Sequence, residues 1–385
     1  MSPFAVLDSS PQKPLPVVAV GAGAMGRAWL AAIGESPEVE LAGIVDLDVD
    51  AARRAAADLD SPDLPVGDDA VALAERVGAR AVVDVTVPVA HHPVTTAALF
   101  AGLPVLGEKP VADTLPRALS LAAAAEVTGQ LFMVSQSRRW NPQLATFRGM
   151  VQDLGAVGAV TTEFFKAPRF GGFRDEMAHP LLVDMAIHAF DSVRYLLETE
   201  PVSAYCETWN PSWSWYAGDA SAGALFEMEG GVRYSYNGSW CAPGAETSWN
   251  GAWRVSGARG TACWDGDAEP VLDADVAAAD RPPSPYSGIA GSLQVFCAAL
   301  RTGEPPMGEV HENIMSLAMV EAAVESAATG QRVLLDDVLA RAHERALAEE
   351  AHPQVRDTLA SWTSLRSVLT GAAGPASSGA SARSA

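Results

Sequence analysis

The sequence predicts an α/β protein of two domains, the first built on a parallel sheet and the second an α+β domain with a largely antiparallel open sheet. Three observations support this prediction. A glycine-rich turn joins an apolar run to an alanine-rich helical pattern at residues 16–28, strand and helix patterns alternate from there to residue 135, and strand-like stretches dominate after residue 142. Alternating strands and helices are typical of parallel sheets, whereas strands that follow one another across turns favour antiparallel pairing.

The glycine-rich turn has the pattern G-x-G-x-x-G and contains Gly21, Gly23, Ala24, Met25 and Gly26. The first glycine of this pattern permits a tight turn, the second lets the backbone approach a pyrophosphate, and the third lets helix and strand pack closely. A second strand-like run ends in Asp46, 20 residues after Gly26, where a carboxylate would bind the adenosine ribose diol. The pattern predicts a Rossmann dinucleotide-binding domain. NAD is favoured because Asp46 would repel a 2′-phosphate, and the nearby Arg53 and Arg54 leave NADP possible.

Further elements of the first domain follow in the same rhythm. We expect helices at residues 51–59, 69–77, 88–100 and from after Lys109 to about 127, with strands at 81–86 and 131–135 and another ending near Lys109. Ligands of open parallel sheets bind at the carboxyl ends of the strands. The residues at or just beyond these ends are Gly21, Asp46, Thr86, Pro88 and Lys109. We therefore expect these five residues to share one rim of the sheet.

Lysine is rare in this chain. The only lysines are Lys13, Lys109 and Lys166, and arginine supplies the rest of the positive charge. Unlike a guanidinium, a lysine ammonium can change its protonation state inside a protein, which suits it to proton-transfer chemistry. Lys109, at the expected rim of the sheet, is therefore the first candidate for catalysis.

The composition excludes several classes of function. The net charge of −21 disfavours nucleic acid and anionic membranes as partners. The four cysteines are widely spaced, so the sequence predicts neither a metal site nor a disulfide framework. A secretory leader and a membrane-spanning stretch are not recognisable. We therefore expect a cytoplasmic enzyme.

In the second domain, strands are expected at residues 159–166, 202–209, 223–228, 231–240, 249–256 and 261–265. One predicted helix precedes most of these strands and carries Asp184 and His188 at positions i and i+4, on one helical face. Asp191 follows three residues later and could fix the imidazole of His188 or cap local structure. A histidine among apolar helix residues is more often a packed core residue, so this pattern alone does not establish catalysis.

Together these residues resemble the Gfo/Idh/MocA family, the group of glucose–fructose oxidoreductase and inositol dehydrogenase. The matching motifs, within residues 16–340, are the glycine turn, Asp46, Pro88 with His92, Glu108-Lys109-Pro110, Arg139-Trp140-Asn141-Pro142 and Asp184-x-x-x-His188-x-x-Asp191. The resemblance implies that Lys109, Asp184 and His188 face the nicotinamide and the substrate. It also implies cofactor contacts for Thr86, Pro88, His92, Glu108, Lys109 and Arg139. The sequence departs from many relatives in placing Val87 between Thr86 and Pro88.

We therefore expect reversible oxidation of a secondary alcohol on a sugar, inositol or related polyol, with His188 as the acid/base and Lys109 and Asp184 assisting. Two alternatives remain open: a hydrolase or lyase that uses tightly bound NAD for transient oxidation, and a non-catalytic NAD-dependent sensor. Candidate substrate contacts in the second domain are Lys166, His179, Trp213 and Trp215. No metal is expected to take part.

The predicted organisation has five segments. These are a flexible arm at 1–15, the NAD(P)-binding domain at 16–141, the substrate and oligomerisation domain at 142–345, a helical extension at 346–370 and a small-residue tail at 371–385. An exposed sheet face would favour a homo-oligomer formed through the C-terminal sheet.

Overall fold

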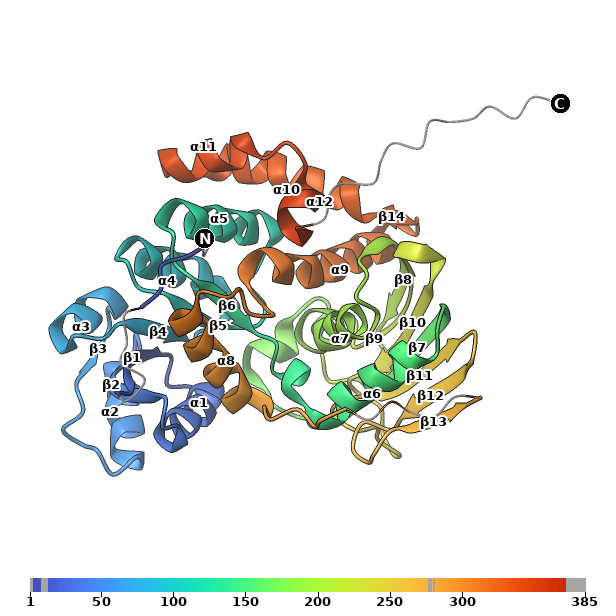
Figure 1. The fold of residues 1–385 in the computed structure, drawn as a ribbon, viewed down its shortest axis with the longest axis horizontal. Coiled ribbons are helices and arrows are strands. Elements are labelled where there is room, and N and C mark those ends of the chain that lie inside the picture. Colours follow the sequence, from blue (N-terminus) through green and yellow to red (C-terminus); the bar gives the residue numbers. More distant parts are fainter. Residues whose placement is uncertain (1–2, 8–12, 276–278, 280, 372–385) are drawn as a thin grey trace.

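The computed structural model describes residues 3–7, 13–275, 279 and 281–371. Its first sheet has six parallel strands in the order β3-β2-β1-β4-β5-β6 (Figure 1). The strands are β1 (Leu15–Val20), β2 (Val39–Val45), β3 (Val66–Gly67), β4 (Ala81–Asp84), β5 (Val105–Glu108) and β6 (Phe132–Ser135). The connecting helices are α1 (Ala24–Glu35), α2 (Val49–Asp58), α3 (Ala70–Val77), α4 (Pro88–Phe100) and α5 (Leu115–Thr128). This order confirms the predicted Rossmann domain.

The second sheet has eight strands in the order β13-β12-β11-β7-β10-β9-β8-β14. The strands are β7 (Val157–Phe165), β8 (Pro201–Trp209), β9 (Ser221–Met228), β10 (Arg233–Ser239), β11 (Ala252–Gly257), β12 (Gly260–Trp264), β13 (Val271–Ala274) and β14 (Val333–Leu334). All neighbours pair antiparallel except β7 and β10, which are parallel. The predicted α+β domain with a mostly antiparallel sheet is thus confirmed.

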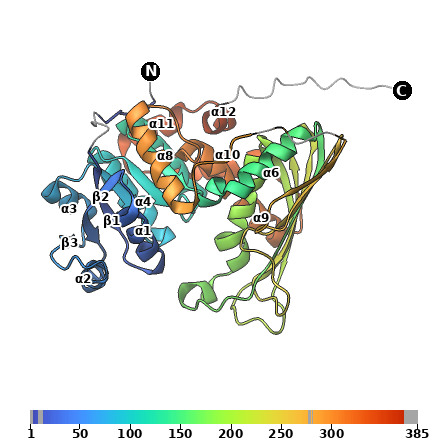
Figure 2. The same ribbon diagram turned by 60° about the horizontal axis from the view of Figure 1, so that its bottom comes forward.

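One face of this second sheet forms a core with two helices, α7 (Ile187–Leu197) and α9 (Val310–Thr329). Phe190 of α7 packs edge-on against Phe226 of β9, with ring centroids 4.8 Å apart. The opposite face carries exposed apolar side chains, including Tyr205, Trp209 and Leu225. Figure 2 shows the sheet edge-on, with α6 (Pro142–Asp153) and α9 on its inner side.

The helix α8 (Gly288–Thr302) was not predicted, and it returns the chain to the first domain (Figure 2). Its residues Leu293, Phe296 and Leu300 are buried in one core with Trp29 of α1. The segment 142–345 therefore does not fold entirely apart from residues 16–141. The predicted helical C-terminal region is present as α10 (Leu335–Glu349), α11 (Pro353–Ser361) and α12 (Leu365–Thr370), with α10 and α11 over α5 (Figure 1).

The N-terminal arm is only partly as expected. Phe4 is buried, the amide of Ala5 donates to the carbonyl of Gly129, and the amide of Leu7 donates to the carbonyl of Leu300. The prediction of a loose arm is therefore wrong for residues 4–7, because an apolar side chain and two backbone hydrogen bonds hold them to the first domain. Residues 1–2 and 8–12 of the arm, and 372–385 of the predicted tail, lie outside the described residues.

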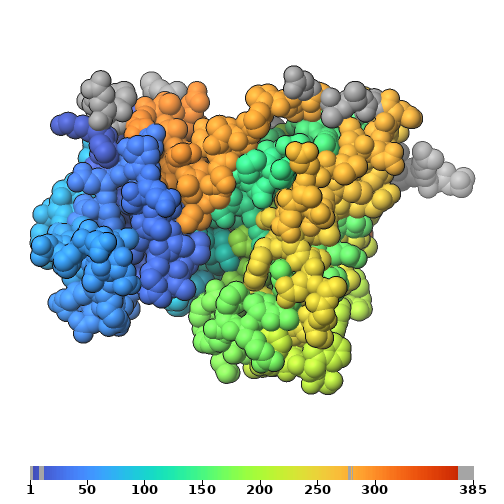
Figure 3. Space-filling view, turned by 90° about the horizontal axis from the view of Figure 1, so that it is seen from below, coloured from blue at the N-terminus to red at the C-terminus, as the bar shows by residue number. Residues whose placement is uncertain are grey.

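The two sheets are joined by helices, and a recess separates their lower parts. Figure 3 shows this recess between the blue surface of the first domain and the green and yellow surface of the second. The chain segments that connect the two domains form its base. The carboxyl ends of β5 and β6 and the amino end of α7 supply the polar residues considered next.

Candidate active site

The glycine turn has the geometry expected of a pyrophosphate-binding loop. Gly21 has a φ of +105°, and a Cβ placed there would lie 2.6 Å from the carbonyl oxygen of Val85. A Cβ at Gly26 would lie 2.1 Å from the carbonyl oxygen of Gly21, whereas one at Gly23 would meet nothing within 4 Å. Gly23 is also the N-cap of α1, without a side-chain capping bond, and Met25 in the first turn is exposed. The first amides of α1 therefore remain available to an anionic group.

Asp46 lies directly after β2 and is fixed beside this loop. Its Oδ2 accepts a hydrogen bond from the amide of Ala22 at 2.8 Å, and its Oδ1 accepts one from the amide of Asp48 at 2.9 Å. A carboxylate can accept about four hydrogen bonds, so Asp46 keeps acceptor capacity for a ribose diol. Together the loop, the helix end and Asp46 fit a dinucleotide.

Lys109 meets Asp184 from the other domain. The Nζ of Lys109 donates to the Oδ1 and to the carbonyl oxygen of Asp184, both at 2.9 Å, and Arg174 donates from Nε to Oδ2 at 2.6 Å. The Lys109 and Asp184 side chains are only 15% and 12% exposed. Burial alone would raise the pKa of Asp184, but Lys109 and Arg174 outweigh it and the pKa is lowered. Two of the three Lys109 donors are occupied, which leaves one for a ligand.

The helix that carries Asp184 differs from the prediction. Asp184 lies in a π-helical turn, η3 (Leu181–Ala186), and His188 lies in the first turn of α7. The wider turn changes the i, i+4 register, and the Asp184 carboxylate bonds Lys109 and Arg174 rather than His188. π-helical turns are short, rare and frequent at functional sites.

His188 is a weakly basic imidazole without a hydrogen-bond partner among the described residues. Burial, followed by the charges of Arg138 and Lys109, lowers its pKa well below the usual value. Its Nδ1 is enclosed and unpaired. Nε2 is not among the enclosed atoms, so it is the nitrogen that can exchange a proton with a ligand. The neutral ring is the form that a general base needs.

Three residues predicted to contact the cofactor have their polar groups engaged inside the protein. Glu108 accepts from the indole Nε1 of Trp29 at 2.8 Å and from the amide of Lys109 at 3.1 Å, and burial raises its pKa. The hydroxyl of Thr86 donates to the Oδ1 of Asp84 at 2.7 Å. His92 bonds the hydroxyl of Ser120 at 3.0 Å. Pro88 is the first residue of α4 and, as a proline, has no backbone N–H to donate.

His91, its neighbour, was not singled out from the sequence. The imidazole is 2% exposed and bridges two loops of the rim: Nε2 lies 3.0 Å from the carbonyl oxygen of Thr86, and Nδ1 lies 2.8 Å from that of Pro110. It thereby ties the end of β4 to the residue after Lys109. The adjacent pair of histidines was visible in the sequence, but only the start of α4 decides which of the two rings points inward.

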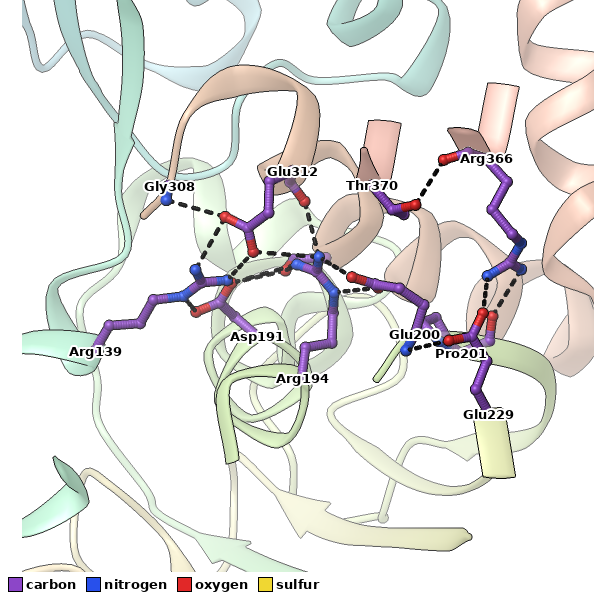
Figure 4. A network of polar contacts seen from close by, with 11 residues as sticks. Arg139, Asp191, Arg194, Glu200, Pro201, Glu229, Gly308, Glu312, Arg366 and Thr370 are labelled. Carbon is purple, nitrogen blue, oxygen red and sulfur yellow. Dashed lines mark hydrogen bonds and ion pairs between the residues drawn. The ribbon is translucent and has the colours of Figure 1, made fainter. Parts of the chain in front are cut away.

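Arg139 is also engaged within the protein. Its guanidinium binds Asp191 through Nε and one terminal nitrogen, at 2.7 and 2.6 Å, and binds both oxygens of Glu312 at 3.0 and 2.7 Å (Figure 4). Asp191 also accepts from Ser316, so its carboxylate orients no imidazole. The network continues through Arg194, which binds Glu200 at 2.6 and 2.7 Å. It joins η1 (Ser137–Trp140), α7 and α9, and so fixes the two domains against each other.

The predicted substrate contacts Lys166, His179, Trp213 and Trp215 all lie in the second domain. Lys166 binds Glu246 at 2.9 Å and lies over the ring of Trp249. The Nδ1 of His179 lies 4.0 Å from Asp219 and makes no hydrogen bond. Trp213 is 61% exposed and donates to the carbonyl of Cys241, and it lines an apolar hollow of about 360 Å³ with Phe165 and Trp209. Trp215 is covered by Arg169, whose guanidinium lies 4.0 Å from its ring.

The structure also bears on other expectations. The described part of the chain contains no group of three or more histidine, cysteine, aspartate or glutamate residues placed to hold a metal ion. Cys206, Cys241, Cys263 and Cys297 are free thiols. Within the same residues, no helix combines the length and apolar character needed to cross a membrane.

Comparison with known proteins identifies the family. Residues 15–136 match the model of the GFO_IDH_MocA oxidoreductase family, NAD-binding Rossmann fold, and residues 144–263 match the GFO/IDH/MocA C-terminal domain. The chain is 29% identical to the uncharacterized protein y4oX of Sinorhizobium fredii, over 84% of this chain and 96% of that one. It is 28% identical to D-apiose dehydrogenase of Paraburkholderia graminis, over 66% and 72%. GenD2 from gentamicin A biosynthesis, solved in complex with NAD, is 25% identical with a TM-score of 0.70, over 85% and 97%.

The chain therefore belongs to the Gfo/Idh/MocA family of NAD-binding oxidoreductases, and the resemblance found in its motifs is confirmed. It is an enzyme whose cofactor is NAD. Gly21, Gly23 and the first amides of α1 would hold the pyrophosphate, and Asp46 would hold the adenosine ribose, as the geometry of the loop allows.

Proposed function

We propose that the protein catalyses the reversible NAD-dependent oxidation of a secondary alcohol on a sugar, inositol or related polyol. His188 is the acid/base, and Lys109 and Asp184 assist it. The observation that carries this proposal is the ion pair between Lys109 and Asp184, at 2.9 Å, near the imidazole of His188. Burial and the charges of Arg138 and Lys109 lower the pKa of that imidazole. Relatives with similar sequences are named D-apiose dehydrogenase and inositol 2-dehydrogenase, which supports the substrate class.

Bound NAD would supply the acceptor for the hydride that leaves the carbinol carbon of the substrate, and the residues of this chain would handle the proton. His188 removes the hydroxyl proton through Nε2, since Nδ1 is enclosed. The third donor of Lys109 binds the same oxygen and stabilises its developing negative charge. Asp184 holds the Lys109 ammonium by two contacts and so fixes its direction. In the reduction, the protonated His188 returns its proton to the forming alcohol.

The architecture supports this arrangement because the two halves of the site come from different domains. Lys109 follows a strand of the first sheet, whereas Asp184 and His188 belong to the segment leading into the second domain. The Arg139 network keeps these domains in fixed register. A substrate in the recess between them would contact both (Figure 3).

The proposal is tested by following NADH absorbance with the purified protein, NAD⁺ and a panel of inositols, aldoses and their acids. Lys109→Met is run beside Lys13→Met, a matched removal of an exposed lysine at the start of the first domain. We expect turnover that is lost in Lys109→Met and kept in Lys13→Met. Substrate consumption without net NADH would instead indicate transient oxidation, and NAD binding without consumption of any compound would contradict an enzyme of this specificity.

The predicted cytoplasmic location and the homo-oligomer formed through the exposed sheet face stay predictions. Sedimentation of the purified protein would check the second. A monomer at micromolar concentration would contradict it.

A further inference from the structure

Arg138 is a cation of the candidate site without a partner. Its side chain is half-buried, yet no hydrogen bond, ion pair or ring contact joins its guanidinium to any described residue. The surrounding cations are all engaged: Lys109 and Arg174 bind Asp184, and Lys166 binds Glu246. Among these, Arg138 is the one whose donors are all unused.

Keeping such a charge away from bulk water is unfavourable. Burial lowers the pKa of Arg138 to about 10, and only the phenol of Tyr236 opposes this. The next residue, Arg139, is more deeply buried, but Asp191 and Glu312 compensate its charge and its pKa is raised despite burial. Binding of an anion offsets the unfavourable burial of an uncompensated guanidinium. The protein supplies that anion for Arg139 and leaves Arg138 without one.

Arg138 faces the same space as the acid/base. It lies in η1, shortly after β6, and β6 pairs with β5, which ends at Glu108 directly before Lys109. After burial, its charge is the largest influence that lowers the pKa of His188, ahead of Lys109. Tyr236, the other group that senses the charge of Arg138, belongs to β10 of the second sheet. Arg138 is therefore close enough to both the imidazole of His188 and the phenol of Tyr236 for its charge to act on them.

We propose that Arg138 binds an anionic group of the substrate, so that the alcohol oxidised belongs to a sugar acid, a hydroxy acid or a sugar phosphate rather than to a neutral polyol. This inference rests on the proposed function and narrows its substrate class. Guanidinium groups pair with carboxylates and phosphates through two parallel hydrogen bonds. The bound anion also offsets the positive charge beside His188, which makes the imidazole a better proton acceptor when the correct substrate is present.

The test compares neutral and anionic forms of the same carbon skeleton. NADH formation is measured with glucose, gluconate, glucuronate and glucose 6-phosphate, and with myo-inositol and its monophosphate, for the unmodified protein, Arg138→Gln, Arg138→Lys and Arg233→Gln. Arg233 is an exposed arginine of β10 paired with Glu227 and serves as the control for loss of one positive charge. In parallel, calorimetry measures binding of the same compounds to the NAD-loaded proteins.

We expect an anionic compound to be turned over with the highest kcat/KM. Arg138→Gln should raise its KM about 10- to 100-fold, as loss of a hydrogen bond to a charged group does, and leave neutral compounds almost unaffected. Arg138→Lys should retain part of the preference. Carboxylates preferred over the phosphates would identify an acid as the substrate, and the reverse would identify a phosphate ester.

Neutral compounds turned over as well as anionic ones, or an equal loss for both in Arg138→Gln, would overturn the inference and leave the proposed function intact. Binding of an anion that depends on Arg138, without NADH formation from any compound, would support the inference and overturn the proposed function. The two failures are therefore distinguishable.

Discussion

Arg138 and Arg139 are neighbours in the chain, yet they belong to opposite kinds of environment. Arg139 meets Asp191 and Glu312 in a network in which nearly every polar atom has a partner (Figure 4). Arg138, Lys109 and His188 form the other region. Here the guanidinium of Arg138, one donor of Lys109 and the imidazole of His188 have no partner among the described residues. The first region holds the domains together, and the second is left incomplete. Proteins satisfy buried polar groups where structure is the purpose, and leave them unsatisfied where a ligand completes them.

The largest expected effect is a loss of kcat when His188, in the region with unpaired groups, is replaced. His188→Asn should lower kcat by roughly 10²–10⁴-fold, because it removes the group that exchanges the proton. NAD binding, measured by fluorescence quenching, should be unchanged. A loss confined to KM would move His188 from catalysis to substrate positioning.

Substitutions in the Arg139 network should instead lower the free energy of unfolding. Glu312→Gln removes one of two carboxylates from Arg139, also weakens the contact with Arg194, and should cost about 1.5–3 kcal/mol of unfolding free energy, because Glu312 is partly exposed and Asp191 still compensates Arg139. Urea titration measures this. Glu325→Gln on the same helix breaks an exposed pair with Arg341 and should cost less than about 1 kcal/mol. Equal costs for the two variants would contradict the view that the network fixes the domains.

A third effect concerns pH and the outer side of α9. His311 lies between Glu309 and Glu126; burial opposes its charge, but the two carboxylates outweigh burial and raise its pKa to about 9. A histidine with a raised folded-state pKa stabilises fully below pH 6.5, and this contribution is lost as pH rises through 9. The loss is at most about 3 kcal/mol. Thermal unfolding between pH 6.5 and 9.5 should show it, and His311→Gln should flatten the profile over that range.

The smallest effect distinguishes the two adjacent histidines. His91→Asn removes the bridge between the carbonyls of Thr86 and Pro110, and should lower kcat/KM about tenfold through displacement of Lys109. His92→Asn disturbs the contact with Ser120 of α5 and should change kcat/KM less. The reverse order would return His92 to the cofactor-contact role that the sequence assigns to it.

The sequence predicted the fold well where local patterns decide it. The strand and helix periods of the first domain, the glycine turn and Asp46 all depend on nearby residues, and the structure places them as expected. The α8 segment escaped prediction because its helix is defined by packing against Trp29, more than 250 residues earlier in the chain. The parallel pairing of β7 with β10 escaped for the same reason.

The candidate site was predictable in its residue types but not in its partners. Lys109, Asp184 and His188 were selected from motifs, and the contact between Lys109 and Asp184 brings two of them together. The sequence assigns Arg139 to the cofactor, whereas in the structure Arg139 is engaged within the protein and its neighbour Arg138 is the arginine without a partner among the described residues. Adjacent arginines look alike in the sequence, and only the position of Asp191 and Glu312 shows which guanidinium is already paired.

The most direct test of the account follows a deuterium atom. The fastest substrate of the panel is labelled at the carbinol carbon, a single turnover is run with NAD⁺, and the cofactor and product are weighed by mass spectrometry. The account predicts one deuterium in the reduced nicotinamide and a ketone product that has lost it, with no transfer in His188→Asn. Deuterium retained in a cleaved or eliminated product, with the cofactor still oxidised, would contradict a dehydrogenase and indicate transient oxidation at the same site.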